Sequence, residues 1–213
     1  MSIDIDLLLV QLSKSFIDCY DTFRKSNLIT IPNLGNHSES DLHSWLQYLL
    51  IKSGEQEGLI PIPEIKMRLT NPIVYKEFGI TNRKRTKSNF KRVDVGYYDS
   101  KKILRGFAEV LTMDEAHGAM SSKELQHNWF TPYDSLPFLV ENAKDKPEFL
   151  IIVLVLLKNT PGIYWKIGIK DIDEKIKTRN YYQVFREQWL TLKQRIKIPN
   201  KMLIITEDGV EQY

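Results

Sequence analysis

Apolar residues along the chain follow two periods, and each period predicts one kind of element. Spacings of three and four residues are typical of amphipathic helices. This spacing covers 3–25, a segment that starts at Ser38 and stops near Gly54, a segment at 122–143 that Pro132 and Pro137 interrupt, and about 178–196. In the second of these helices the predicted buried stripe is Leu42, Trp45, Leu46, Leu49 and Leu50.

Other segments have the alternating or continuously apolar pattern of strands. They are 59–69, 91–98, 103–112, 149–157 and 201–206. Prolines at the start of the first predict an edge or bent strand, and the short polar connection 99–102 predicts that the second and third form an antiparallel hairpin. The nine apolar residues of 149–157 predict a central strand covered on both faces. The order α, α, β, β, β, α, β, α, β predicts an α/β fold with a mixed central sheet flanked by helices.

The chain shows no internal repeat and no low-complexity linker, so we expect one domain over 1–213. Within it, 1–27 is an added N-terminal helix, 38–157 is the core, and 158–213 supplies a helix and a strand that complete the sheet. The N-terminal helix has two open uses, a homodimer face or packing on its own domain.

Composition restricts the setting of the protein more than its function. Its 213 residues are 42% hydrophobic and 27% charged, which is typical of a globular chain. Cys19 is the single cysteine, and the N-terminus lacks the basic flank of a signal peptide, so we expect an intracellular, cytoplasmic protein. The longest apolar run is far shorter than the roughly 20 residues of a membrane span, and we expect no membrane segment.

The net charge of +3 is too small to indicate a partner, but it is unevenly distributed. Seven basic residues and one acid lie between Lys76 and Arg92, a net +6 that leaves −3 for the rest of the chain. Interleaved Thr, Asn and Ser residues predict an exposed loop or loose hairpin there. Phosphate binding and simple solvation are both open uses for it.

Two acids lie inside predicted strands, Asp94 in RVDVGYY and Glu109 in GFAEVL. Burying an ionised carboxylate is costly unless a cation or hydrogen-bond donors compensate for it. On neighbouring strands of one hairpin the two side chains could converge and ligate a hard divalent ion, Mg²⁺ or Mn²⁺. Glu39, at the border of the buried stripe of the second helix, could join them. For each acid the alternative is a structural ion pair with a lysine or arginine.

This arrangement resembles the PD-(D/E)xK nuclease superfamily, and most of all its archaeal Holliday junction resolvase branch. The resemblance rests on a helix with Glu39, a strand, a hairpin with Asp94 and Glu109, a helix and a strand, over 38–157. It implies a restriction-endonuclease-like core and a homodimeric, metal-dependent DNA endonuclease of the structure-specific, resolvase-like kind. Residue by residue, it implies that Asp94, Glu109 and the main-chain carbonyl of Val110 ligate the metal, joined by Glu39 as the glutamate of the resolvase branch.

The chain departs from that motif at Leu111, where the family has a lysine. Either another cation replaces it, with Lys123 and Lys158 as candidates, or catalysis is lost and a nucleic-acid-binding protein remains. The catalytic set implied is Glu39, Asp94, Glu109 and Lys123. The residues expected to bind DNA are Arg83, Lys84, Arg85, Lys87, Lys91, Arg92 and Arg105. We expect no zinc site, because His37 and His43 lack the spacing of one and Cys19 has no second cysteine.

Overall fold

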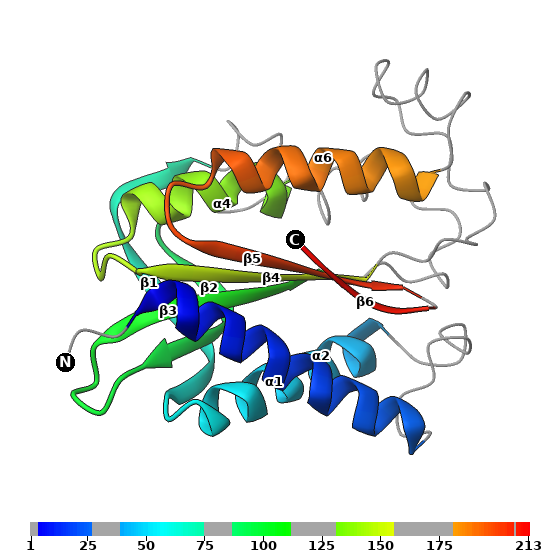
Figure 1. Ribbon diagram of the computed structural model, residues 1–213. Helices are drawn as coiled ribbons and strands as arrows, with labels where there is room; N and C mark the ends of the chain where they lie inside the picture. The colour runs from blue at the N-terminus through cyan, green and yellow to red at the C-terminus, as the bar shows by residue number, and fades with distance from the viewer. Residues whose placement is uncertain (1–3, 27–38, 75–86, 112–130, 156–180, 207) are drawn as a thin grey trace.

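The computed structural model describes residues 4–26, 39–74, 87–111, 131–155, 181–206 and 208–213 (Figure 1). The helices of this part are α1 (Ile5–Lys25), α2 (Glu39–Gln56), α4 (Thr131–Asn142) and α6 (Tyr181–Arg195). The strands are β1 (Ile60–Val74), β2 (Lys87–Tyr98), β3 (Leu104–Leu111), β4 (Phe149–Val155), β5 (Asn200–Thr206) and β6 (Gly209–Gln212). The predicted α/β fold is confirmed.

The six strands form one mixed sheet in the order β1-β2-β3-β4-β5-β6. The first three are antiparallel, β4 is parallel to both β3 and β5, and β6 returns antiparallel to β5. The predicted hairpin is therefore confirmed in β2 and β3, as is the edge position of β1. The all-buried β4 is a central strand, as its apolar run predicts.

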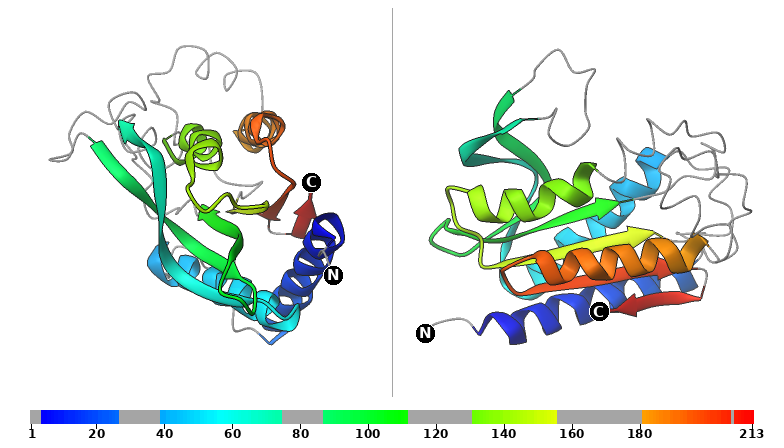
Figure 2. Two further views of the ribbon diagram at one scale, coloured as in Figure 1. Left: turned by 90° about the vertical axis from the view of Figure 1, so that its left-hand side faces the viewer. Right: turned by 90° about the horizontal axis from the view of Figure 1, so that it is seen from above.

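Helices cover both faces of the sheet (Figures 1 and 2). Along β4 the side chains alternate between two cores, with Ile151 and Val153 facing α1 and α2, and Ile152 and Leu154 facing α4 and α6. We call these the α1/α2 core and the α4/α6 core. No helix of the described part is long and apolar enough to cross a membrane.

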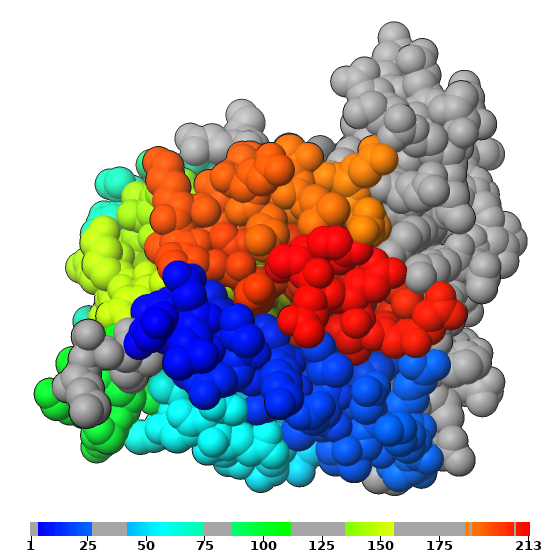
Figure 3. Space-filling model, viewed as in Figure 1, coloured from blue at the N-terminus to red at the C-terminus, as the bar shows by residue number. Residues whose placement is uncertain are grey.

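The N-terminal helix packs on its own sheet, which is one of its two predicted uses. Leu12, Phe16 and Tyr20 of α1 are fully buried in the α1/α2 core. The Asp4 carboxylate accepts the main-chain N–H groups of Asp6 and Leu7, which caps the helix at its start. Figure 3 shows α1 lying across this face of the molecule between α2 and β6.

Three details of the second and third predicted helices are corrected. Helix α2 continues through Gly54, where a Cβ atom would meet the Tyr97 ring at 2.7 Å, and the chain turns instead at Gly58 with φ +74°. Trp45 is 37% exposed and does not belong to the buried stripe. Pro137 lies inside α4, where burial of Leu139 and other apolar side chains offsets the helical hydrogen bond that proline cannot make.

Strands β1 and β2 are longer than the sequence pattern predicts. Their pairing continues to Ile73↔Ser88 and Val74↔Lys87, so 87–90 of the basic segment belongs to strand β2 as well, within a hairpin with β1. The hairpin they form projects beyond the other four strands (Figure 2). The rest of the basic segment, with Arg83, Lys84 and Arg85, lies outside the described residues.

Candidate functional site

Asp94 and Glu109 lie where two neighbouring strands separate. Pairing between β2 and β3 runs from Tyr98 to Val95↔Ala108, which makes Asp94 and Glu109 the next facing positions. Beyond that point the Asp94 carboxylate accepts the main-chain N–H of Val110 at 2.7 Å. The side chain of Asp94 therefore occupies the place that a strand carbonyl takes in a regular antiparallel ladder. We call this point the strand fork.

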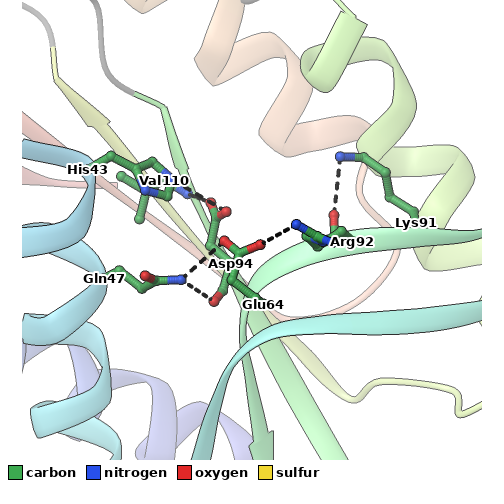
Figure 4. A network of polar contacts seen from close by, with 7 residues as sticks. All are labelled: His43, Gln47, Glu64, Lys91, Arg92, Asp94 and Val110. Carbon is green, nitrogen blue, oxygen red and sulfur yellow. Dashed lines mark hydrogen bonds and ion pairs between the residues drawn. The ribbon is translucent and has the colours of Figure 1, made fainter. Parts of the chain in front are cut away.

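Helix α2 supplies two polar side chains that hold Asp94 in place (Figure 4). His43 Nε2 lies 3.3 Å from Asp94 Oδ1, and Gln47 Nε2 donates to the main-chain carbonyl of Asp94 at 2.7 Å. His43 and Gln47 are four residues apart on the helix and so share one face of it. Both oxygens of the Asp94 carboxylate are thus engaged, one by His43 and one by Val110.

Glu109 is the buried acid of the site. Its side chain is 7% exposed, and its Oε1 atom has no hydrogen-bond partner among the described residues. Burial raises the pKa of Glu109 well above its usual range, opposed by the charge of Lys91 and reinforced by Asp94. Burial also pushes the pKa of Asp94 upward, but the hydrogen bonds from His43 and Val110 outweigh it and hold that pKa below its usual value. The surroundings therefore favour the charged form of Asp94 and the protonated form of Glu109.

Lys91 lies on the same face of the sheet as Glu109. On β2 it is two residues before Val93, which is buried in the α4/α6 core, and on β3 Glu109 lies between Phe107 and Leu111 of that core. The Lys91 ammonium donates to the Arg92 carbonyl at 3.2 Å, and its charge opposes the rise in the pKa of Glu109. Lys91 is thus a cation of the site itself as well as of the basic segment.

Glu64 completes the polar network from the edge strand (Figure 4). It lies opposite Asp94 on β1 with φ +54°, in the left-handed region that glutamate seldom adopts. Its carboxylate contacts Arg92 at 3.2 Å and lies 3.4 Å from the Gln47 amide. The positive charge of Arg92, on the neighbouring strand β2, therefore offsets the negative charge of Glu64.

The structure describes the side chains of some of the remaining predicted site residues and not of others. Glu39 is the first residue of α2, one turn before His43, and its side chain lies outside the described part. Lys123 and Lys158 lie outside it too. Leu111 is buried in the α4/α6 core, so position 111 supplies no polar group.

Arg105, which the sequence analysis expects to bind DNA, is paired with two acids of its own chain. Its guanidinium lies 2.5 Å from Glu148 and 3.8 Å from Asp99, and its side chain is 19% exposed. These two acids neutralise its charge at the end of β3 remote from Glu109.

Sequence reasoning missed His43, Gln47 and Glu64 as members of the site. For the first two a signal was present, because they are polar residues four apart beside the buried stripe of a helix that contains Leu46 and Leu50. For Glu64 there was none, since nothing in the sequence indicates a left-handed residue opposite Asp94.

The described residues offer a pair of carboxylates for a metal ion rather than a full ligand set. No three His, Cys, Asp or Glu side chains in this part of the chain are grouped closely enough to hold one. The pair itself fits a hard cation, because Glu109 brings a buried oxygen without a partner next to the charged Asp94. Further oxygens would have to come from the main chain, as at Val110, or from Glu39.

Comparison with known proteins gives no family for this chain: no protein-family model, no curated protein and no solved structure matches it. The fold class and the strand fork are therefore the basis on which its function is inferred.

Proposed function

We propose that the chain is a metal-dependent DNA nuclease with a restriction-endonuclease-like core, using Mg²⁺ or Mn²⁺. The observation that carries the proposal is Glu109, a buried acid with an unpartnered oxygen facing the charged Asp94. Such a group costs stability unless something binds to it, and carboxylate oxygens are the ligands that these ions prefer.

The order of elements supports the same proposal. From α2 through β1, the β2–β3 hairpin and α4 to β4, the chain has the helix, strand, hairpin, helix and strand on which the resemblance to PD-(D/E)xK nucleases rests. The two motif acids occupy facing positions on that hairpin. This support is by analogy of fold and is weaker than the chemistry of the pair.

Each residue of the strand fork has a role in the proposal. Asp94, Glu109 and the Val110 carbonyl would hold the ion, which when bound supplies positive charge to a phosphodiester under attack. His43 and the Val110 N–H fix the orientation of Asp94. Lys91, on the face of Glu109, is our candidate for the cation that Leu111 does not supply, because an ammonium there offsets charge that develops on the phosphate.

A cleavage assay tests the proposal. Duplex, branched and single-stranded DNA are incubated with Mg²⁺ or Mn²⁺ and the wild type, Asp94→Asn, Glu109→Gln or Lys91→Met. Matched controls are Glu141→Gln and Lys197→Met, which change the two members of an exposed ion pair outside the predicted DNA-binding set. We expect the first three variants to lose cleavage, by about 100-fold or more for the two acids, and the controls to retain it.

Equal cleavage by the wild type and both acid variants would contradict the assigned site. Intact DNA binding without cleavage by the wild type would favour the second candidate, a catalytically silent nucleic-acid-binding protein. The observation that favours that candidate is the burial of Leu111, which leaves the family's lysine position inside the core. The homodimer stays a prediction, which sedimentation at micromolar concentration tests.

A further inference from the structure

The outward face of the β1–β2 hairpin carries a line of cations with one aromatic ring among them. Strand pairing puts Arg68 opposite Phe90 and Lys66 opposite Arg92. Residues directly opposite each other share a face of a sheet, and residues two apart on a strand do so as well. These four side chains therefore form one row, which we call the hairpin stripe. The other face of the hairpin carries Met67, which is buried in the α4/α6 core.

Phe90 is exposed in the middle of this stripe. Its side chain is 40% exposed, and the Lys66 ammonium stands 5.6 Å from the centre of its ring. A single exposed apolar residue needs no explanation by itself. Here, however, the ring is flanked by lysine and arginine side chains and contributes to neither of the two cores. A ring face between cations is the arrangement that binds an anionic strand with planar groups attached to it.

The hairpin stripe leads directly to the strand fork. Phe90 and Arg92 lie on one face of β2, opposite to Lys91 and Val93, and Arg92 contacts Glu64, the residue across from Asp94 on β1. Four residues of strand cover about 13 Å, which corresponds to about four nucleotides of a stacked DNA strand at 3.4 Å each. Arg92, whose side chain is 62% exposed, lies between the ring and the acids.

We propose that Phe90, with Lys66 over its ring, is a stacking site for an unpaired base of a DNA strand whose phosphates follow Arg68 and Arg92 toward Asp94. In a duplex each base is already stacked on its neighbours, so a protein ring has access to a base face only where the strand is single or opened. The substrate therefore has unpaired nucleotides about four positions from the bond at the strand fork. This last statement rests on the proposed nuclease function, whereas the stacking site does not.

Binding of single-stranded DNA in EDTA tests the stacking site without any cleavage. Oligonucleotides carry the fluorescent base 2-aminopurine at one position each, and affinity and fluorescence are measured for the wild type, Phe90→Ala and Phe90→Trp. Tyr48→Ala is the matched control, because Tyr48 is also an exposed ring, 39% exposed, with Lys52 at 5.7 Å from its centre, but on α2.

We expect Phe90→Ala to weaken single-strand binding about 5- to 150-fold and to abolish the quenching of 2-aminopurine at one position. Phe90→Trp should keep both, Tyr48→Ala should match the wild type, and duplex binding should change less than twofold. Wild-type affinity in Phe90→Ala, or an equal loss in Tyr48→Ala or on duplex DNA, would overturn the inference. Urea unfolding curves measured for each variant test whether its fold is intact. If Asp94→Asn and Glu109→Gln leave cleavage unchanged, the nuclease proposal fails while the stacking site stands.

Discussion

Replacing Glu109 should make the protein more stable in the absence of metal ions. Glu109→Gln removes the ionisable group, and Glu109→Met replaces the whole carboxyl with apolar atoms of similar size. In a core that needed the carboxylate, either change would destabilise the fold. At this position the fold gains little from it, because burial makes the charged form of Glu109 costly and Oε1 has no partner among the described residues, which outweighs the hydrogen bond that the side chain shares with Asp94.

The expected size of the effect follows from the cost of a buried polar atom without a partner, about 1–3 kcal/mol. Glu109→Met should raise the free energy of unfolding by about that amount in EDTA near neutral pH. Glu109→Gln should gain less, because its amide is still polar. A divalent ion that binds only the folded chain, at a concentration 100 times its dissociation constant, adds about 2.7 kcal/mol to the free energy of unfolding of the wild type. It adds nothing to that of a chain without the site.

Urea unfolding in EDTA and in Mg²⁺ or Mn²⁺ measures both effects. The variants should be more stable than the wild type in EDTA, and the metal should narrow or reverse that difference by stabilising the wild type alone. Glu141→Gln, with the same chemical change on an exposed side chain, should stay within about 0.5 kcal/mol of the wild type in either solution. A loss of several kcal/mol in Glu109→Met without metal, or equal stabilisation of all chains by the ion, would refute the reasoning.

Three further predictions concern the same fork and the sheet behind it. Because the fold raises the pKa of Glu109, the folded chain binds the proton of this side chain more tightly than the unfolded chain does. The stability that this proton contributes is present below pH 4.5 and is lost as the pH rises through the raised pKa, by at most about 1.4 kcal/mol per pH unit. Urea midpoints measured between pH 5 and pH 8 should therefore show a slope that Glu109→Gln lacks. Asp94→Ala should lower the free energy of unfolding by about 1–3 kcal/mol, since the Val110 N–H loses its acceptor, and Asp94→Asn, which keeps an acceptor, should lose less in the same measurement; equal losses would contradict this. Gly106→Ala should lower the thermal midpoint, by a destabilisation of about 1–3 kcal/mol, because its Cβ would lie 2.5 Å from the buried Phe149 ring, and an unchanged midpoint would show that the ring yields freely.

The sequence predicts the sheet better than it predicts the site. The nine-residue apolar run gives β4 and its central place, and four polar residues between two apolar runs give the β2–β3 hairpin. Both are local patterns that fit only one kind of element. Strand β6 was missed, because its four residues are mostly half-exposed and carry no alternation to detect.

The site depends on where strands separate, which no local pattern encodes. Asp94 and Glu109 could be predicted to face each other from the hairpin alone. That their pKa values diverge follows from α2, whose His43 reaches Asp94 from about 50 residues earlier in the chain, and this contact is set by packing of the whole layer. Trp45 is a similar case, since its helical spacing fits the buried stripe but its ring lies beside those of Phe23 on α1 and Tyr48 and stays 37% exposed.

The hydrogen bond from the Val110 N–H to Asp94 makes the two acids of the fork unequal under mutation. Position 94 must present an acceptor for the Val110 N–H, so losing Asp94 costs stability whether or not the site acts in catalysis. Position 109 has no such protection, because Oε1 of Glu109 is buried and takes part in no hydrogen bond with the described residues. Under the proposed nuclease function, Glu109 is kept for the metal ion and not for the fold, and an apolar residue at that position would mark a relative without metal-dependent cleavage.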